Sequence, residues 1–202
     1  DHPAAATFWR HRRAAPALLG RPHQVIAACR ACLALDPGNA DARFGEAGAL
    51  LLLGDYQAGW PAYESRHLLP EAVADTAGVQ RAPLWLGTPA LEGRTLLLRA
   101  EQGLGDTLQF VRYAPLLRGR AGRLLLAVPP PLLRLLDGLA DAVVDDSAEL
   151  PPHDLQTPLL SLPLALGTTL ASVPATVPYL RPDSALAAAW AARLGPTRRL
   201  RV

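Results

Sequence analysis

The chain has 202 residues, of which 50% are apolar and 19% are charged, and its 20 basic and 18 acidic residues leave a net charge of +2. This composition excludes a disordered tail and indicates one large globular domain or two small ones. The small net charge argues against a nucleic-acid-binding surface. No apolar stretch is long enough to span a membrane without an intervening proline, glycine or charge.

Cysteine and lysine usage indicates the compartment and the source. Two cysteines are too few for a disulfide framework, which favours a reducing, cytoplasmic compartment. The basic residues are all arginine, and alanine and leucine are abundant, which indicates a GC-rich bacterial genome. Because the chain contains no methionine, we expect it to be a piece of a longer protein.

An internal repeat of 34 residues marks the first part of the chain. Leu-Leu-Gly occurs at residues 18–20 and again at residues 52–54, and three alanines recur at the same offset. This is the period of the tetratricopeptide helical hairpin. We predict two such hairpins over residues 1–71, with Pro61 in the first turn of a helix. Two repeats are fewer than a solenoid normally needs, so the hairpins require contacts with other parts of the protein.

Short apolar runs alternate with helix-like stretches in the second part. The runs suit buried parallel strands and lie at residues 95–100, 123–128, 142–144 and 154–160. The helix-like stretches lie at residues 106–114, 132–139 and 183–194. This alternation predicts a Rossmann-like open parallel α/β sheet after the helical hairpins. Residues 198–202 resemble the start of another strand, so we expect the chain to stop short of a further domain.

The predicted organisation therefore has four segments. They are a tetratricopeptide-repeat region (1–71), a connector (72–93), a Rossmann-like α/β domain (94–180), and a linker helix that leads to a missing second domain (181–202).

The loop from Glu101 to Asp106 is the most informative segment. Gly103 and Gly105 begin like a dinucleotide-binding fingerprint, but residue 108 is leucine where a third glycine is required. Asp106 at the start of a helix would also repel a pyrophosphate, so NAD binding is disfavoured.

Two roles for Asp106 remain open and are compatible. Asp106 is a favoured N-cap residue, and Gln109 three residues later would complete a capping box. It would also lie at the carboxyl end of a strand, where it could act as a general base towards an acceptor hydroxyl.

The segment Glu101-Gln102-Gly103-Leu104-Gly105-Asp106-Thr107-Leu108-Gln109-Phe110-Val111-Arg112-Tyr113 resembles the signature of bacterial tetratricopeptide-repeat proteins with a glycosyltransferase domain. These proteins are similar to the heptosyltransferases and, more distantly, to the O-linked N-acetylglucosamine transferases. Residues 54–64, 83–85 and 159–169 support the resemblance.

The resemblance implies a GT-B architecture, in which two Rossmann-like domains face each other across a cleft. The first would hold the acceptor, and the second, missing here, the nucleotide-sugar donor. Asp106 matches the aspartate proposed as the catalytic base of heptosyltransferases, and Gln102, Gly103, Leu104, Gly105 and Gln109 would line the acceptor side. No metal or cofactor is implied in this chain, although the complete enzyme would use a nucleotide-sugar. Half of such a cleft would be inactive alone.

The alternative is a non-catalytic module in which the repeats bind a peptide or protein partner and the α/β half is a scaffold. Cys29 and Cys32 are interpreted as core residues, since no second pair of ligands would complete a zinc site. Arg112 lies on the helix face of Gln109, where it would reach a ligand or pair with a surface acid.

Overall fold

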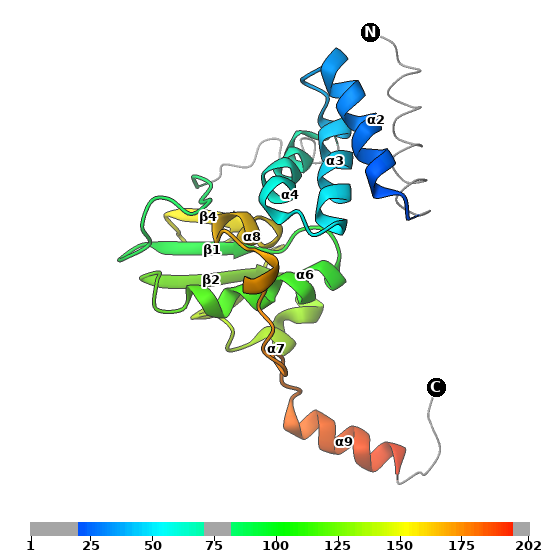
Figure 1. Ribbon diagram of the computed structural model, residues 1–202. Coiled ribbons are helices and arrows are strands. Elements are labelled where there is room, and N and C mark those ends of the chain that lie inside the picture. The colour runs from blue at the N-terminus through cyan, green and yellow to red at the C-terminus, as the bar shows by residue number, and fades with distance from the viewer. Residues whose placement is uncertain (1–19, 71–81, 196–202) are drawn as a thin grey trace. The chain divides into compact units, whose positions relative to one another are not determined.

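The structure is a computed structural model that describes residues 20–70 and 82–195 (Figure 1). It divides into two compact units, each built from two stretches of chain. The helical unit extends to Pro89 and also takes in Ser161–Val173, and the sheet unit comprises Ala90–Leu160 and the chain from Pro174 onward. The protein is therefore of the mixed α/β class. The four predicted segments stay a prediction, and the structure groups residues 161–173 with the helices instead of the strands.

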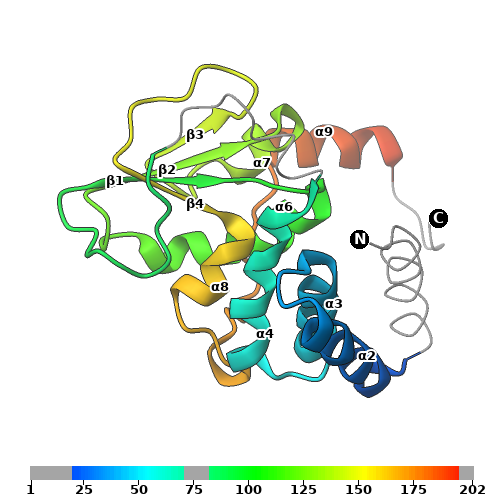
Figure 2. The same cartoon turned by 90° about the horizontal axis from the view of Figure 1, so that it is seen from above.

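The described residues of the helical unit's first stretch contain α2 (Pro22–Leu35), α3 (Ala40–Leu52), α4 (Tyr56–Tyr63) and the 3₁₀ helix η1 (Glu64–Leu68). Helix α3 contacts both α2 and α4 and lies between them (Figure 2). The α2–α3 contact buries Val25, Ile26 and Cys29 against Ala49 and Leu50. Cys29 and Cys32 are both buried, as the sequence predicts.

Side-chain caps and one glycine determine where the helices begin and how closely they pack. Asn39 accepts a hydrogen bond from the amide of Ala42 at 2.9 Å, and Asp55 accepts one from Ala58 at 3.2 Å. A Cβ on Gly59 would lie 2.7 Å from a Leu51 methyl carbon, so glycine permits the close approach of α4 to α3. Because α4 begins at Tyr56, the prediction that Pro61 opens a helix is wrong, and Pro61 lies inside α4. The first helix of the first predicted hairpin lies outside the described residues.

Two segments distant in sequence complete the helical unit. Trp85 is buried and its indole nitrogen donates to the carbonyl of Pro89 at 2.8 Å. Gly87 has a positive φ of 107°, and a Cβ there would lie 2.8 Å from the carbonyl oxygen of Ala165 in α8 (Leu162–Ala165). Helix α8 also contacts α4. These contacts add buried surface to the helices of this unit.

A buried ionic network holds η1 to Ser161 inside the helical unit. The side chain of Arg66 is only 4% exposed and donates to Glu64 Oε1 and to Ser161 Oγ, both at 2.7 Å. Ser161 Oγ in turn donates to Glu64 Oε2 at 2.9 Å. The Arg66 guanidinium also lies 5.0 Å from the centroid of the Tyr63 ring. The network joins residues that are 97 positions apart in the chain.

The network has a consequence for stability at low pH. Burial raises the pKa of Glu64, but the neighbouring His67, Arg66 and Ser161 side chains outweigh it, and the pKa lies below its ordinary value of 4.5. A carboxyl with a lowered folded-state pKa stabilises the fold above its unfolded pKa and loses that contribution as the pH falls through the folded-state value. The free energy of unfolding in urea should be higher for the wild type than for Glu64→Gln. We expect this advantage to be constant above about pH 5.5 and to shrink on further acidification. An advantage that does not change down to pH 3 would contradict this assignment.

The sheet unit contains four parallel strands in the order β3-β2-β1-β4: β1 (Thr95–Arg99), β2 (Arg123–Val128), β3 (Ala142–Asp145) and β4 (Leu155–Pro158). Strands β4, β1 and β2 lie side by side in Figure 1. The order matches the first four strands of the doubly wound sheet 3-2-1-4-5-6. Each of the four predicted apolar runs coincides with a strand to within a few residues, so the prediction of parallel strands is confirmed.

The two central strands form the core of the sheet unit. Leu96–Leu98 of β1 and Leu124–Leu126 of β2 are fully or almost fully buried. Leu97 pairs in register with Leu125 on one side and with Gln156 on the other. Strands buried on both faces read as continuous apolar runs, which explains why neither strand alternates apolar with polar residues.

Helical turns connect the strands, and a longer helix follows the sheet. The connecting turns are α6 (Leu104–Phe110), η2 (Val111–Leu117), η3 (Pro130–Leu132) and α7 (Leu133–Leu136). The 3₁₀ helix η4 (Leu159–Ser161) follows β4, and η5 (Leu170–Ser172) lies in the helical unit. Helix α9 (Ser184–Leu194) has no buried residue, and its Trp190 is 52% exposed. Asp183 accepts from the Leu186 amide at the start of α9 and pairs with Arg134 at 2.8 Å. The strand expected at residues 198–202 lies outside the described residues.

Within the described ranges, no helix combines the length and the apolar character needed to cross a bilayer.

Candidate functional site

The loop that follows β1 lies at the switch point of the sheet. Strands β2 and β3 continue from β1 in one direction, whereas β4 pairs with the opposite edge of β1. Ligands of open α/β sheets bind outside the carboxyl ends of the strands where the order reverses in this way. The segment from Ala100 to Gly103 leaves the end of β1 at that position and leads into α6.

Asp106 caps the helix, but from a different position than the sequence predicts. Gly103 is the N-cap, in an extended conformation (φ −90°, ψ 171°), and its carbonyl accepts from the Thr107 amide at 3.1 Å. Asp106 is the third helical residue, and its Oδ2 accepts from the Gly103 amide at 3.1 Å. The prediction that Asp106 is the N-cap with Gln109 as its capping-box partner is therefore wrong. Asp106 instead occupies the partner position of a box with Gly103.

Glu101 ties the loop to the neighbouring strand, a role that the sequence did not reveal. Its Oε1 accepts a hydrogen bond from the Leu160 amide at 3.2 Å, just beyond the end of β4. Two residues earlier, Arg99 donates to the buried side chain of Gln156 on β4 at 3.4 Å. Two polar contacts therefore bridge β1 and β4 at their carboxyl ends. In the sequence, these two contacts are indicated only by a polar residue at the end of an apolar run.

Gln102 has an unusual backbone conformation. Its φ is 61°, and it is the one residue other than glycine among the described residues with a positive φ. The left-handed region is unfavourable for side chains with a Cβ, and such strain is concentrated at functional sites. Gln102 therefore marks this loop as a candidate site independently of the glycine pattern.

A pair of substitutions tests the strain at Gln102. We expect Gln102→Gly to leave the free energy of unfolding within about 1 kcal/mol of the wild type, because glycine adopts positive φ without a penalty. Gln102→Val should destabilise by about 1–2 kcal/mol, because a β-branched residue is poorly tolerated there. Urea unfolding of the two variants checks both values. Equal stability of the two variants would show that the loop relaxes out of this conformation.

Four of the predicted acceptor-binding residues are consecutive, and the fifth, Gln109, lies further along α6. Gln102, Gly103, Leu104, Gly105 and Gln109 are all exposed, whereas Asp106 is half-buried. Adjacency in the loop and in the first two turns of α6 brings them together.

Two consecutive aspartates, Asp145 and Asp146, lie at the carboxyl end of the outer strand β3. Hydrogen bonds from Ser147 lower the pKa of the Asp145 carboxyl, whereas burial and the charge of Asp145 raise the pKa of Asp146, with Arg99 opposing that rise. Within residues 20–70 and 82–195, no group of three or more metal-ligating side chains comes together.

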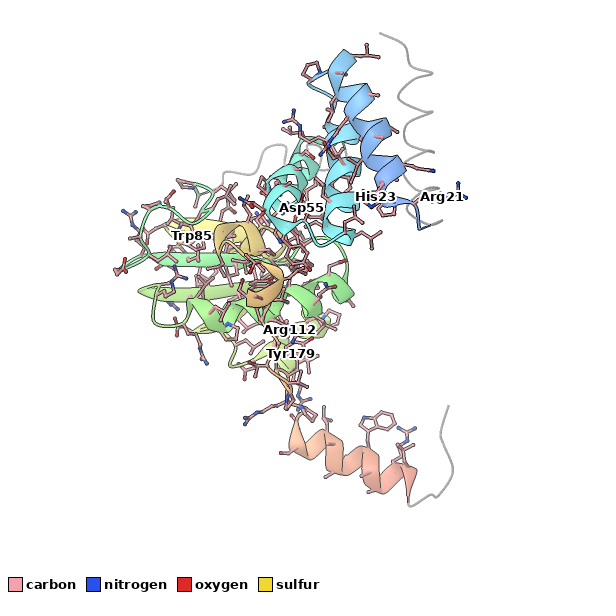
Figure 3. All side chains as sticks on the ribbon, viewed as in Figure 1. Arg21, His23, Asp55, Trp85, Arg112 and Tyr179 are labelled. Carbon is pink, nitrogen blue, oxygen red and sulfur yellow. The ribbon has the colours of Figure 1, made fainter. Side chains whose placement is uncertain are left out.

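Arg112 does not pair with an acid in the part of the chain that the structure describes, so the expected surface ion pair is absent there. Its guanidinium carbon instead lies 4.6 Å from the ring centroid of Tyr179, in the segment that precedes α9 (Figure 3). The Tyr179 hydroxyl donates to the Leu108 carbonyl at 3.0 Å. Arg112 and Tyr179 both belong to the sheet unit.

Comparison with known proteins gives one partial match. Protein FlbA of Caulobacter vibrioides is 34% identical over 110 residues, which cover 52% of this chain and 18% of FlbA. The match thus spans less than a fifth of that relative's length. No family model matches the chain, and no solved structure matches it.

Proposed function

We propose that this chain is the tetratricopeptide-repeat and acceptor-binding part of a bacterial, cytoplasmic glycosyltransferase with GT-B architecture. One observation carries the proposal. The segment from Glu101 to Asp106, which resembles the transferase signature, lies after β1 beside β4 at the switch point of a parallel sheet. The positive φ of Gln102 supports a functional role for the same loop.

In the proposed reaction, Asp106 takes the proton of an acceptor hydroxyl as its oxygen attacks the anomeric carbon of a nucleotide-sugar. The bond from that carbon to the nucleoside diphosphate breaks, and the diphosphate leaves. Gln102, Gln109 and the amides of Gly103 to Gly105 would orient the acceptor. The donor would be bound by a second domain, so this chain alone is proposed to be inactive.

The size of the native protein and its turnover test this function. We expect the intact mass of the protein from its source cells to exceed the 21.5 kDa of this chain. The native protein, supplied with a panel of nucleotide-sugars and cell extract as acceptor, should release nucleoside diphosphate in an acceptor-dependent manner. A native mass near 21.5 kDa would exclude a self-sufficient transferase.

The second candidate is a non-catalytic module in which the helical unit binds a peptide or protein partner. The exposed leucines at the ends of its helices favour it, namely Leu35, Leu52 and Leu68. Substituting Asp106 separates the two functions, since partner binding by the helices should not depend on this carboxylate.

A further inference from the structure

The side chain of Arg112 is held in one orientation by an aromatic ring. Leu108 lies one helical turn before Arg112, and its carbonyl accepts the Tyr179 hydroxyl at 3.0 Å. This bond fixes the ring beside the guanidinium, whose carbon is 4.6 Å from the ring centroid (Figure 3). A cation in this position is attracted by the face of the ring.

The guanidinium lacks the partners that a half-buried cation normally has. Its Nε is buried and has no hydrogen-bond partner in the part of the chain that the structure describes. The residue is half-buried, and no described residue accepts a hydrogen bond from its two terminal nitrogens or pairs with them. Burying a charge without a counter-charge is unfavourable, and one ring contact offsets this only in part. Such an unsatisfied group calls for a bound species as its explanation.

We propose that Arg112 is the binding residue of an oxyanion site for the phosphate or carboxylate group of a small-molecule ligand. The planar guanidinium presents paired N–H groups that match two oxygens of such a group. Tyr179 is the positioning residue, because its ring holds the guanidinium in place. Gln109 is exposed and lies three residues earlier, in α6, and its side-chain amide is a further candidate donor. The site does not depend on transferase activity.

Titration with inorganic phosphate tests the site directly. Isothermal titration at constant ionic strength, balanced with chloride, should detect phosphate binding to the wild type. Arg112→Gln should weaken it by about tenfold or more, since charge-assisted hydrogen bonds are lost. Arg112→Lys keeps the positive charge but loses the paired N–H groups of the guanidinium. Its phosphate affinity should therefore lie between those of the wild type and Arg112→Gln. Arg134→Gln is the matched control, because Arg134 is 68% exposed and already paired with Asp183, and it should bind phosphate as the wild type does.

Variants of the ring and a second probe complete the test. Tyr179→Phe keeps the ring but loses its hydrogen bond to Leu108, so it should lower the phosphate affinity less than Tyr179→Leu, which removes the ring. Acetate that binds as tightly as phosphate would indicate a carboxylate ligand, and a clear preference for phosphate would indicate a phosphorylated one. The proposal is overturned if Arg112→Gln binds phosphate as tightly as the wild type. If Arg112→Gln does not fold, wild-type phosphate affinity in Arg112→Lys overturns it instead. It is also overturned if the wild type does not distinguish phosphate from chloride.

Discussion

Replacing Glu64 with glutamine is expected to destabilise the protein by about 3 kcal/mol, because the change removes the negative charge that faces a buried guanidinium. The side chain of Arg66 is 4% exposed and that of Glu64 is 18% exposed, so water screens their interaction poorly. Glutamine can replace one acceptor oxygen, but its amide cannot accept from both Arg66 and Ser161 as the carboxylate does. The free energy of unfolding from urea titration at pH 7 measures the loss.

A second glutamate of the helical unit provides a matched control. Glu46 pairs with Arg30 at 2.6 Å, but the side chain of Arg30 is 64% exposed, so Glu46→Gln should cost less than about 1 kcal/mol. Equal losses in the two variants would show that the buried network contributes no more than a surface ion pair. A Ser161→Ala variant should give an intermediate loss, because it removes two hydrogen bonds and no charge.

The local pattern predicts the strands well, whereas contacts between distant residues decide the rest of the fold. Runs such as Arg123–Val128 identify their strands because only a sheet buried on both faces needs such continuous apolar character. The grouping of Ser161–Val173 with the helices could not be predicted, because it depends on contacts between residues distant in sequence, such as the bond between Arg66 and Ser161, 95 residues apart. Pro61 misled the prediction, since Asp55 starts α4 one turn earlier.

The position of the candidate site could be predicted from the sequence, but the contacts within the site could not. The glycines and Asp106 identify the loop, and the preceding apolar run places it at the carboxyl end of a strand. The capping position was wrong because the extended backbone of Gly103 lets the helix begin at Leu104. The roles of Glu101 and Gln102 depend on the Leu160 amide and on a backbone angle, which no pattern of residue types encodes.

The largest expected effect on activity is that of Asp106→Asn, which should lower transfer by the complete protein by about 10²–10⁴-fold if the carboxylate is the general base. The side-chain oxygen of asparagine can still accept from the Gly103 amide, as Asp106 Oδ2 does at 3.1 Å. The stability of the helix start should therefore change by less than about 1 kcal/mol. The kcat for a nucleotide-sugar and the urea midpoint of the same preparation separate the loss of a base from the loss of a cap.

Comparison with two further variants decides between the roles of Asp106. Asp106→Ala removes base and cap together, so it should match Asp106→Asn in activity but lose about 1 kcal/mol more in stability. Asp137→Asn makes the same change at an exposed aspartate of the sheet unit and should leave activity unaltered. If Asp106→Asn keeps most of the activity while Asp106→Ala loses stability, the carboxylate serves only to cap α6. The proton of the acceptor would then have to pass to another group, of which Glu101 lies nearest in sequence and already borders the switch point.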